Sequence, residues 1–132
     1  MHTIIAYIAA LVSLIALDML WILVLAKKFY AAQMGFLFSK SINFAPVAFF
    51  YPLYALGILL LAVLPAFGAT SWVEALWRGA LLGLVVYGAY DLTNQATIAN
   101  WPTSMTFVDM AWGIVVTALT SLIAYFMITA FK

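Results

Sequence analysis

Long apolar runs alternate with short polar stretches along this chain of 132 residues. A helix that crosses a bilayer needs about 20 mostly apolar residues to span about 30 Å of hydrocarbon. Four runs reach that length, and they cover about residues 3–25, 45–64, 72–97 and 107–131. The pattern therefore predicts an all-α integral membrane protein with four transmembrane helices in a compact bundle. It forms a single domain over residues 1–132, and both termini lie on the same side of the membrane.

Polar residues at the ends of the runs indicate how the helices begin and end. Ser71 and Glu74 have the spacing of a capping box, and Glu74 and Arg78 have the i,i+4 spacing of an ion pair. Asn100-Trp101-Pro102 should interrupt the chain before the last run, because the residue before a proline avoids helical angles. Thr106 to Asp109 also matches a capping pattern, so that Asp109 is either a helix cap or a pocket residue.

The segment between the first two runs, from Lys27 to Ser41, is mildly amphipathic. We expect a short interfacial helix there, lying in the headgroup region with its lysines toward phosphates. Lys27, Lys28 and Lys40 lie in this connection, so the positive-inside rule places it in the cytoplasm and both termini outside. The first run is too long for a cleavable signal peptide and lacks a small-residue cleavage site, so we expect it to be retained.

The composition excludes several classes of protein. Hydrophobic residues make up 69% of the chain, charged residues 7%, and the mean hydropathy is +1.20. A soluble domain carries about a quarter charged residues, so the expected surroundings are a lipid bilayer. A net charge of +1 makes nucleic acid an unsuitable partner, and the absence of cysteine excludes disulfides and thiolate metal sites.

Three aspartates lie too deep in the predicted helices to reach the headgroups. Asp18 precedes Lys27 by nine residues, about 13 Å along a helix, and a short aspartate side chain cannot cover that distance. Asp91 is late in the third run and Asp109 early in the fourth. The chain direction places all three in the half of the membrane bounded by the first and third connections. Ionisable residues at such depth are candidates for function by default.

Aromatic and polar residues accompany these acids at helical spacing. Tyr87, Tyr90, Asp91 and Asn94 lie on one helix face, while Asp18 with Trp21, and Asp109 with Trp112, are three residues apart. Gly83 precedes the first set on its face, and Gly113, Thr117 and Ser121 form a row of small residues suited to helix packing. The ligand-binding candidates are Asp18, Trp21, Tyr51, Tyr54, Tyr87, Tyr90, Asp91, Asn94, Asp109 and Trp112.

Each candidate also has a purely structural interpretation. Asp18 can join helices as a protonated acid, Asp91 can organise the polar turn near Asn94 and Gln95, and the tyrosines can form an interfacial belt. No catalytic motif is visible, and no cofactor is expected. The three aspartates and Asn94 could offer oxygen ligands to a hard cation, but nothing in the sequence fixes their spacing to that geometry, so metal binding is a minor alternative.

Several motifs together resemble a known family. They are Tyr90-Asp91-Leu92-Thr93-Asn94, Trp101-Pro102, Asp109-x-x-Trp112-Gly113, Asp18-x-x-Trp21 and Phe50-Tyr51-x-x-Tyr54. In this combination the chain is similar to a bacterial family of small inner-membrane proteins known only as a numbered domain of unknown function. The resemblance covers almost the whole chain. It implies a bacterial inner-membrane protein with four helices, and it supplies no activity.

Three functions are compatible with an acidic, aromatic-lined pocket inside the membrane. The preferred hypothesis is a proton-linked transporter or binding protein for a small polar or cationic solute. The alternatives are an intramembrane enzyme acting on a lipid or isoprenoid-like substrate, with Asp91 or Asp18 as acid or base, and a non-catalytic assembly partner. Because four helices make a thin bundle, a homodimer is a further hypothesis.

Overall fold

The computed structural model describes residues 1–37 and 43–132, and every regular element in them is helical. Two of the long helices contain a wider, π-helical turn: Trp21–Leu25 continues α1, and Leu59–Val63 joins α3 to α4. A 3₁₀ turn, Gly35–Leu37, follows α2. The helices are α1 (His2–Leu20), α2 (Lys27–Met34), α3 (Phe44–Ile58), α4 (Leu64–Gly68), α5 (Trp72–Thr97) and α6 (Thr103–Ala130).

Three helical segments of the described chain are long and apolar enough to cross a membrane: His2–Leu25, Phe44–Gly68 and Thr103–Ala130. Their outer faces carry large exposed apolar side chains, as at Ile4, Ile8 and Val12 on α1. Soluble proteins rarely expose apolar surface on this scale. The structure therefore agrees with an all-α membrane protein. The more polar α5, expected as a fourth span, is not among the three segments.

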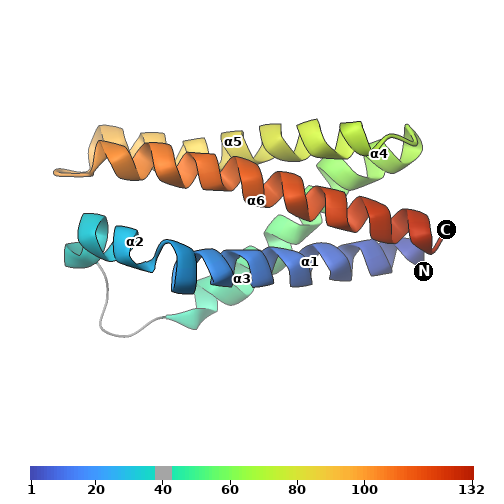
Figure 1. Ribbon diagram of the computed structural model, residues 1–132, viewed down its shortest axis with the longest axis horizontal. Helices are drawn as coiled ribbons and strands as arrows, with labels where there is room; N and C mark the ends of the chain where they lie inside the picture. Colours follow the sequence, from blue (N-terminus) through green and yellow to red (C-terminus); the bar gives the residue numbers. More distant parts are fainter. Residues whose placement is uncertain (38–42) are drawn as a thin grey trace.

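The helices form one elongated bundle (Figure 1). Helix α6 runs antiparallel to both α5 and α1, and α3 crosses behind them obliquely before α4 leads into α5. Both termini lie at the same end of the bundle, while α2 and the α5–α6 turn lie at the other.

Small residues bring α5 and α6 close together, as the sequence pattern predicted. A Cβ atom on Gly83 would overlap the carbonyl oxygen of Gly113, and one on Gly79 would overlap the Ser121 side chain. A Cβ atom on Gly113 would in turn overlap the side chain of Tyr87. This tight contact fixes the register of the two helices and thereby the positions of the acids farther along them.

Several helix ends differ from the sequence-based expectation. The second run continues through Pro65 to Gly68, because Pro65 lies in the first turn of α4, where a missing N–H does no harm. Ser71 occupies the N-cap position of α5 but its side chain makes no capping hydrogen bond, so the predicted capping box is wrong there. Its partner Glu74 instead forms the expected ion pair with Arg78, at 2.7 Å.

Helix α6 begins at Thr103, which is earlier than predicted, and this places Asp109 inside the helix. The capping interpretation of Thr106 and Asp109 is therefore wrong. Thr106 accepts a hydrogen bond of 3.0 Å from Trp101 Nε1 and donates one of 2.8 Å to Gln95 Oε1. Gln95 Nε2 donates to the Trp101 carbonyl at 3.2 Å. These bonds close the turn between α5 and α6 without an aspartate.

The expected helix after the first run is present as α2. Ala26, Tyr30 and Met34 are buried at i,i+4 spacing and pack with Trp101 and Met105 at the entrance to α6. The part of the predicted segment from 38 to 42, which includes Lys40 and Ser41, lies outside the described residues.

Candidate functional site

Asp18 ends a buried stripe on α1. Ala6, Ala10, Leu14 and Asp18 follow one another at intervals of four residues, and Asp18 is only 7% exposed. Its carboxylate accepts hydrogen bonds from the Tyr51 hydroxyl on α3 and from Trp112 Nε1 on α6, the latter at 3.0 Å. The apolar stripe therefore delivers a carboxylate into the bundle, where donors from two other helices hold it.

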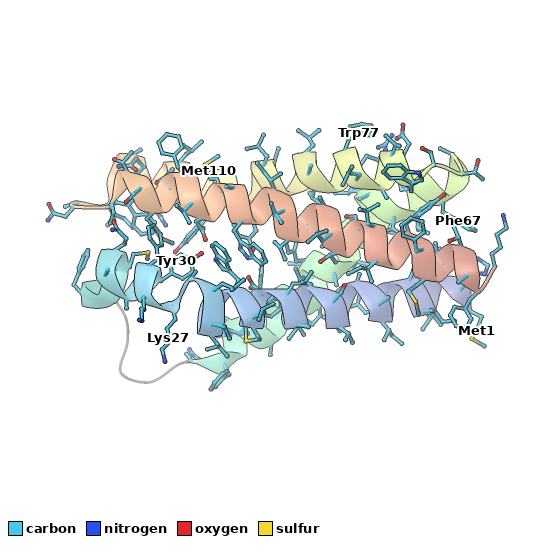
Figure 2. The ribbon with its side chains drawn as sticks, viewed as in Figure 1. Met1, Lys27, Tyr30, Phe67, Trp77 and Met110 are labelled. Carbon is cyan, nitrogen blue, oxygen red and sulfur yellow. The ribbon has the colours of Figure 1, made fainter. Side chains whose placement is uncertain are left out.

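Asp109 occupies a similar position on α6, with an exposure of 8%. The Tyr30 hydroxyl donates a hydrogen bond of 2.9 Å to Asp109 Oδ1, and Trp21 Nε1 donates one of 2.6 Å to the Tyr30 oxygen. Figure 2 shows Tyr30 on the side of α2 that faces α6, whereas Lys27 points away from the bundle. A relay of three side chains thus connects α1, α2 and α6.

Burial raises the pKa of the Tyr30 hydroxyl well above its ordinary value. The hydrogen bond from Trp21 opposes this shift, and the negative charge of Asp109 adds to it. Tyr30 consequently remains a hydrogen-bond donor to Asp109 at neutral pH.

Two stacked tryptophans join the two hydrogen-bonded groups. The Trp21 and Trp112 rings lie 4.5 Å apart between centroids, with an interplanar angle of 6°. Trp112 donates to Asp18, and Trp21 donates to the phenol that holds Asp109. The stack therefore fixes the two carboxylates relative to each other.

A cleft of about 280 Å³ is lined by both carboxylates, those of Asp18 and Asp109. In the described part of the chain none of the side chains that line it is basic. A second cleft, of about 250 Å³, is lined mainly by apolar side chains, namely Phe50, Val86, Tyr87 and Tyr90, and it shares Tyr87 and Asp109 with the first. The first cleft is lined by Asp18, Ile22, Tyr30, Met34, Tyr87, Asp109 and Trp112.

Asp91 lies at a different kind of position. It is fully buried on α5, and neither carboxyl oxygen has a hydrogen-bond partner among the described residues. The carboxyl groups of Asp91 and Asp109 are close enough to interact. Asp91 makes no hydrogen bond to the α5–α6 turn, so the interpretation of this residue as an organiser of that turn is wrong.

The remaining candidates lie around this centre. Tyr54 is buried and shares a hydrogen bond of 2.7 Å with Thr117. Tyr90 is 52% exposed and packs edge-on against Trp101. Asn94 is half-buried and lines neither cleft. The structure thus brings together Asp18, Trp21, Tyr51, Tyr87, Asp109 and Trp112. Asp91 interacts with Asp109 but lines neither cleft.

Tyr30 and Met34 line the cleft but were missing from the sequence-based candidates. Lys27 and Lys28 favour a helix on the membrane surface, and this pattern alone does not predict that the helix has a buried face. The spacing of Ala26, Tyr30 and Met34 is the signal that could have revealed this face.

Comparison with known protein families matches residues 3–126 to a family described as a predicted membrane protein, DUF2177. No curated protein and no solved structure matches the chain. The family match spans almost the whole length of the bundle and agrees with the resemblance carried by the aspartate and tryptophan motifs. The chain therefore belongs to the DUF2177 family of predicted membrane proteins.

Proposed function

We propose that this membrane protein binds a small cationic solute in the cleft between Asp18 and Asp109, and that it moves this solute in exchange for protons. One observation carries the proposal: carboxylates from α1 and α6 line one cleft together with Tyr30, Tyr87 and Trp112, and none of the described lining side chains is basic. Buried carboxylates need a compensating charge or hydrogen bonds. A cation in the cleft would supply the charge.

The aromatic side chains suit an organic cation better than a bare metal ion. Ring faces attract ammonium groups, most strongly when these are removed from water. The cleft, at about 280 Å³, is near the lower end of small-molecule sites. The hydrogen bonds from Tyr30, Tyr51 and Trp112 hold the carboxylates in place before any ligand arrives.

The proposal includes a fourth span. Helix α5 has 26 residues, about 39 Å, and packs along α6 through Gly79 and Gly83. With α5 the bundle has four spans, α2 lies at the interface with Lys27 and Lys28 exposed, and both termini face the outside of a bacterial inner membrane. Because the chain lacks cysteine, single introduced cysteines report topology without background.

The topology test uses four variants with one cysteine each. Thr70→Cys and Lys132→Cys should react with a membrane-impermeant thiol reagent added outside intact cells. Lys28→Cys and Asn100→Cys should react only after the membrane is opened. Labelling of Thr70→Cys and Asn100→Cys from the same side would contradict a fourth span, because these two residues lie at opposite ends of α5.

Transport is tested in proteoliposomes with a trapped pH dye. A gradient of methylammonium or tetramethylammonium should drive proton movement in the wild-type protein, and Asp18→Asn should abolish it. Glu74→Gln is the matched control, because Glu74 is an acid paired with Arg78 away from the cleft. Proton movement that is equal in wild type and Asp18→Asn, or absent with every cation, would overturn the proposal.

A lipid-like substrate is the second candidate, and the cleft around Phe50 and Val86 favours it. This apolar cleft opens onto Asp109, so an amphiphile could place its chain there and its polar group beside the acid. Protein purified in mild detergent and analysed by mass spectrometry should then carry a defined lipid. Asp109→Asn should lose this lipid, while Glu74→Gln should retain it.

A further inference from the structure

Asp91 and Asp109 are neighbours across the α5–α6 contact, but their surroundings differ. Asp109 receives the Tyr30 hydrogen bond and lines both clefts. Asp91 has 0% exposure and no hydrogen-bond partner among the described residues. The tight approach of Gly83 to Gly113 sets this register, so the pairing of the two acids follows from the helix packing.

The three carboxyl groups differ in the hydrogen bonds that they receive. Among the described residues, Asp18 has two hydrogen-bond donors and Asp109 has one. Asp91 has none in the described part of the chain, and a buried carboxylate without donors or a counterion is strongly disfavoured. The negative charge of a neighbouring Asp109 disfavours a second charge still further.

Among the described residues, no basic side chain forms an ion pair with Asp91, Asp109 or Asp18. Tyr87 and Tyr90 flank Asp91 on α5, and Asp109 faces it from α6. The other titratable groups around the cleft are Asp18 on α1, Tyr30 on α2, and Tyr51 and Tyr54 on α3. On α5 the basic residue is Arg78, thirteen residues and about 20 Å away, where it pairs with Glu74.

We propose that Asp91 holds the exchangeable proton of this protein, and that a cation bound beside Asp109 drives the proton out. When a cation neutralises Asp109, the repulsion that keeps Asp91 protonated decreases. The O–H bond of Asp91 then breaks, and the proton passes by way of Asp109 to the cleft and to water. One positive charge enters and one leaves, so the net charge of the site is unchanged. This exchange step rests on the proposed function, whereas the location of the proton does not.

Infrared difference spectroscopy tests the location of the proton in purified protein at neutral pH without ligand. The wild-type protein, Asp18→Asn and Glu74→Gln should show the carbonyl stretch of a protonated carboxylic acid. Asp91→Asn should lose this band, and Asp91→Glu should keep it at a shifted frequency. Asp91→Glu also serves if Asp91→Asn fails to fold. The proposal would be overturned if Asp91→Asn kept the band unchanged. It would also be overturned if Asp91→Glu lost the band or showed it at the wild-type frequency.

Proton release tests the exchange step. Tetramethylammonium added to weakly buffered wild-type protein should release about one proton per cation bound, with binding followed by tryptophan fluorescence. Asp91→Asn should bind the cation without releasing a proton. Equal release from Asp91→Asn and wild type would overturn the exchange. If no cation binds the wild-type protein, the proposed function fails, and the infrared band alone decides where the proton resides.

Discussion

The Tyr30 hydroxyl donates a hydrogen bond of 2.9 Å to Asp109, a residue 79 positions later in the chain. The bond attaches α2 to the beginning of α6 and satisfies a carboxylate that has little contact with solvent. It also positions the phenol as an acceptor for Trp21. A residue from a short connecting helix thereby becomes part of the wall of the cleft.

Tyr30→Phe should lower the free energy of unfolding by about 1–3 kcal/mol, because Asp109 loses its donor and Trp21 its acceptor. The measurement is the thermal unfolding midpoint in detergent. Tyr7→Phe is the matched control, since the Tyr7 hydroxyl donates to the Pro52 carbonyl at an exposed position and should contribute less. Equal destabilisation by both variants would contradict a special role for Tyr30.

The stability of the wild-type protein should depend more steeply on alkaline pH than that of Tyr30→Phe. Burial raises the pKa of Tyr30 in the folded state from its ordinary value of 10.0. The folded chain therefore keeps a proton that the unfolded chain loses, so the contribution of Tyr30 is present below the ordinary pKa and decreases as the pH rises above it. Unfolding midpoints measured from about pH 9 to 11 test this. Parallel curves for the two proteins would refute the expectation.

Trp112→Phe separates the two roles of Trp112. The phenyl ring can still stack on Trp21, but the N–H donor to Asp18 is lost. Loss of this buried hydrogen bond should destabilise the protein by about 1–3 kcal/mol, and the affinity for tetramethylammonium should decrease. Trp77→Phe is the control, because Trp77 is 45% exposed. A loss of stability and affinity that is equal in both variants would show that the Asp18 contact contributes nothing particular.

Gly83→Ala should disrupt the α5–α6 contact. The added methyl group would overlap the backbone of Gly113, which cannot move without separating the helices. We therefore expect the free energy of unfolding to fall by about 1–3 kcal/mol. Gly57→Ala meets no atom within 4 Å and should be neutral or stabilising, since alanine favours a helix by up to about 1 kcal/mol. Unfolding midpoints of the two variants decide the question. A stable Gly83→Ala protein would contradict the close packing.

Local features of the helices could be predicted from the sequence because they depend on neighbours in the chain. The runs near residues 3–25 and 72–97 agree with His2–Leu25 and Trp72–Thr97, and the row of small residues on α6 packs against the α5 glycines as expected. Capping patterns failed where the chain had a better alternative. Trp101 and Gln95 engage Thr106, and this lets α6 begin before Asp109.

The sequence by itself determined that the long helices would carry three aspartates, because side-chain hydropathy and helical period are local properties. Only the tertiary structure decided how each aspartate is solvated. Donors to Asp18 come from α3 and α6, and the donor to Asp109 comes from α2. Asp91 receives none among the described residues. Hydrogen bonds between residues so distant in the chain depend on helix register and crossing, which no local pattern specifies.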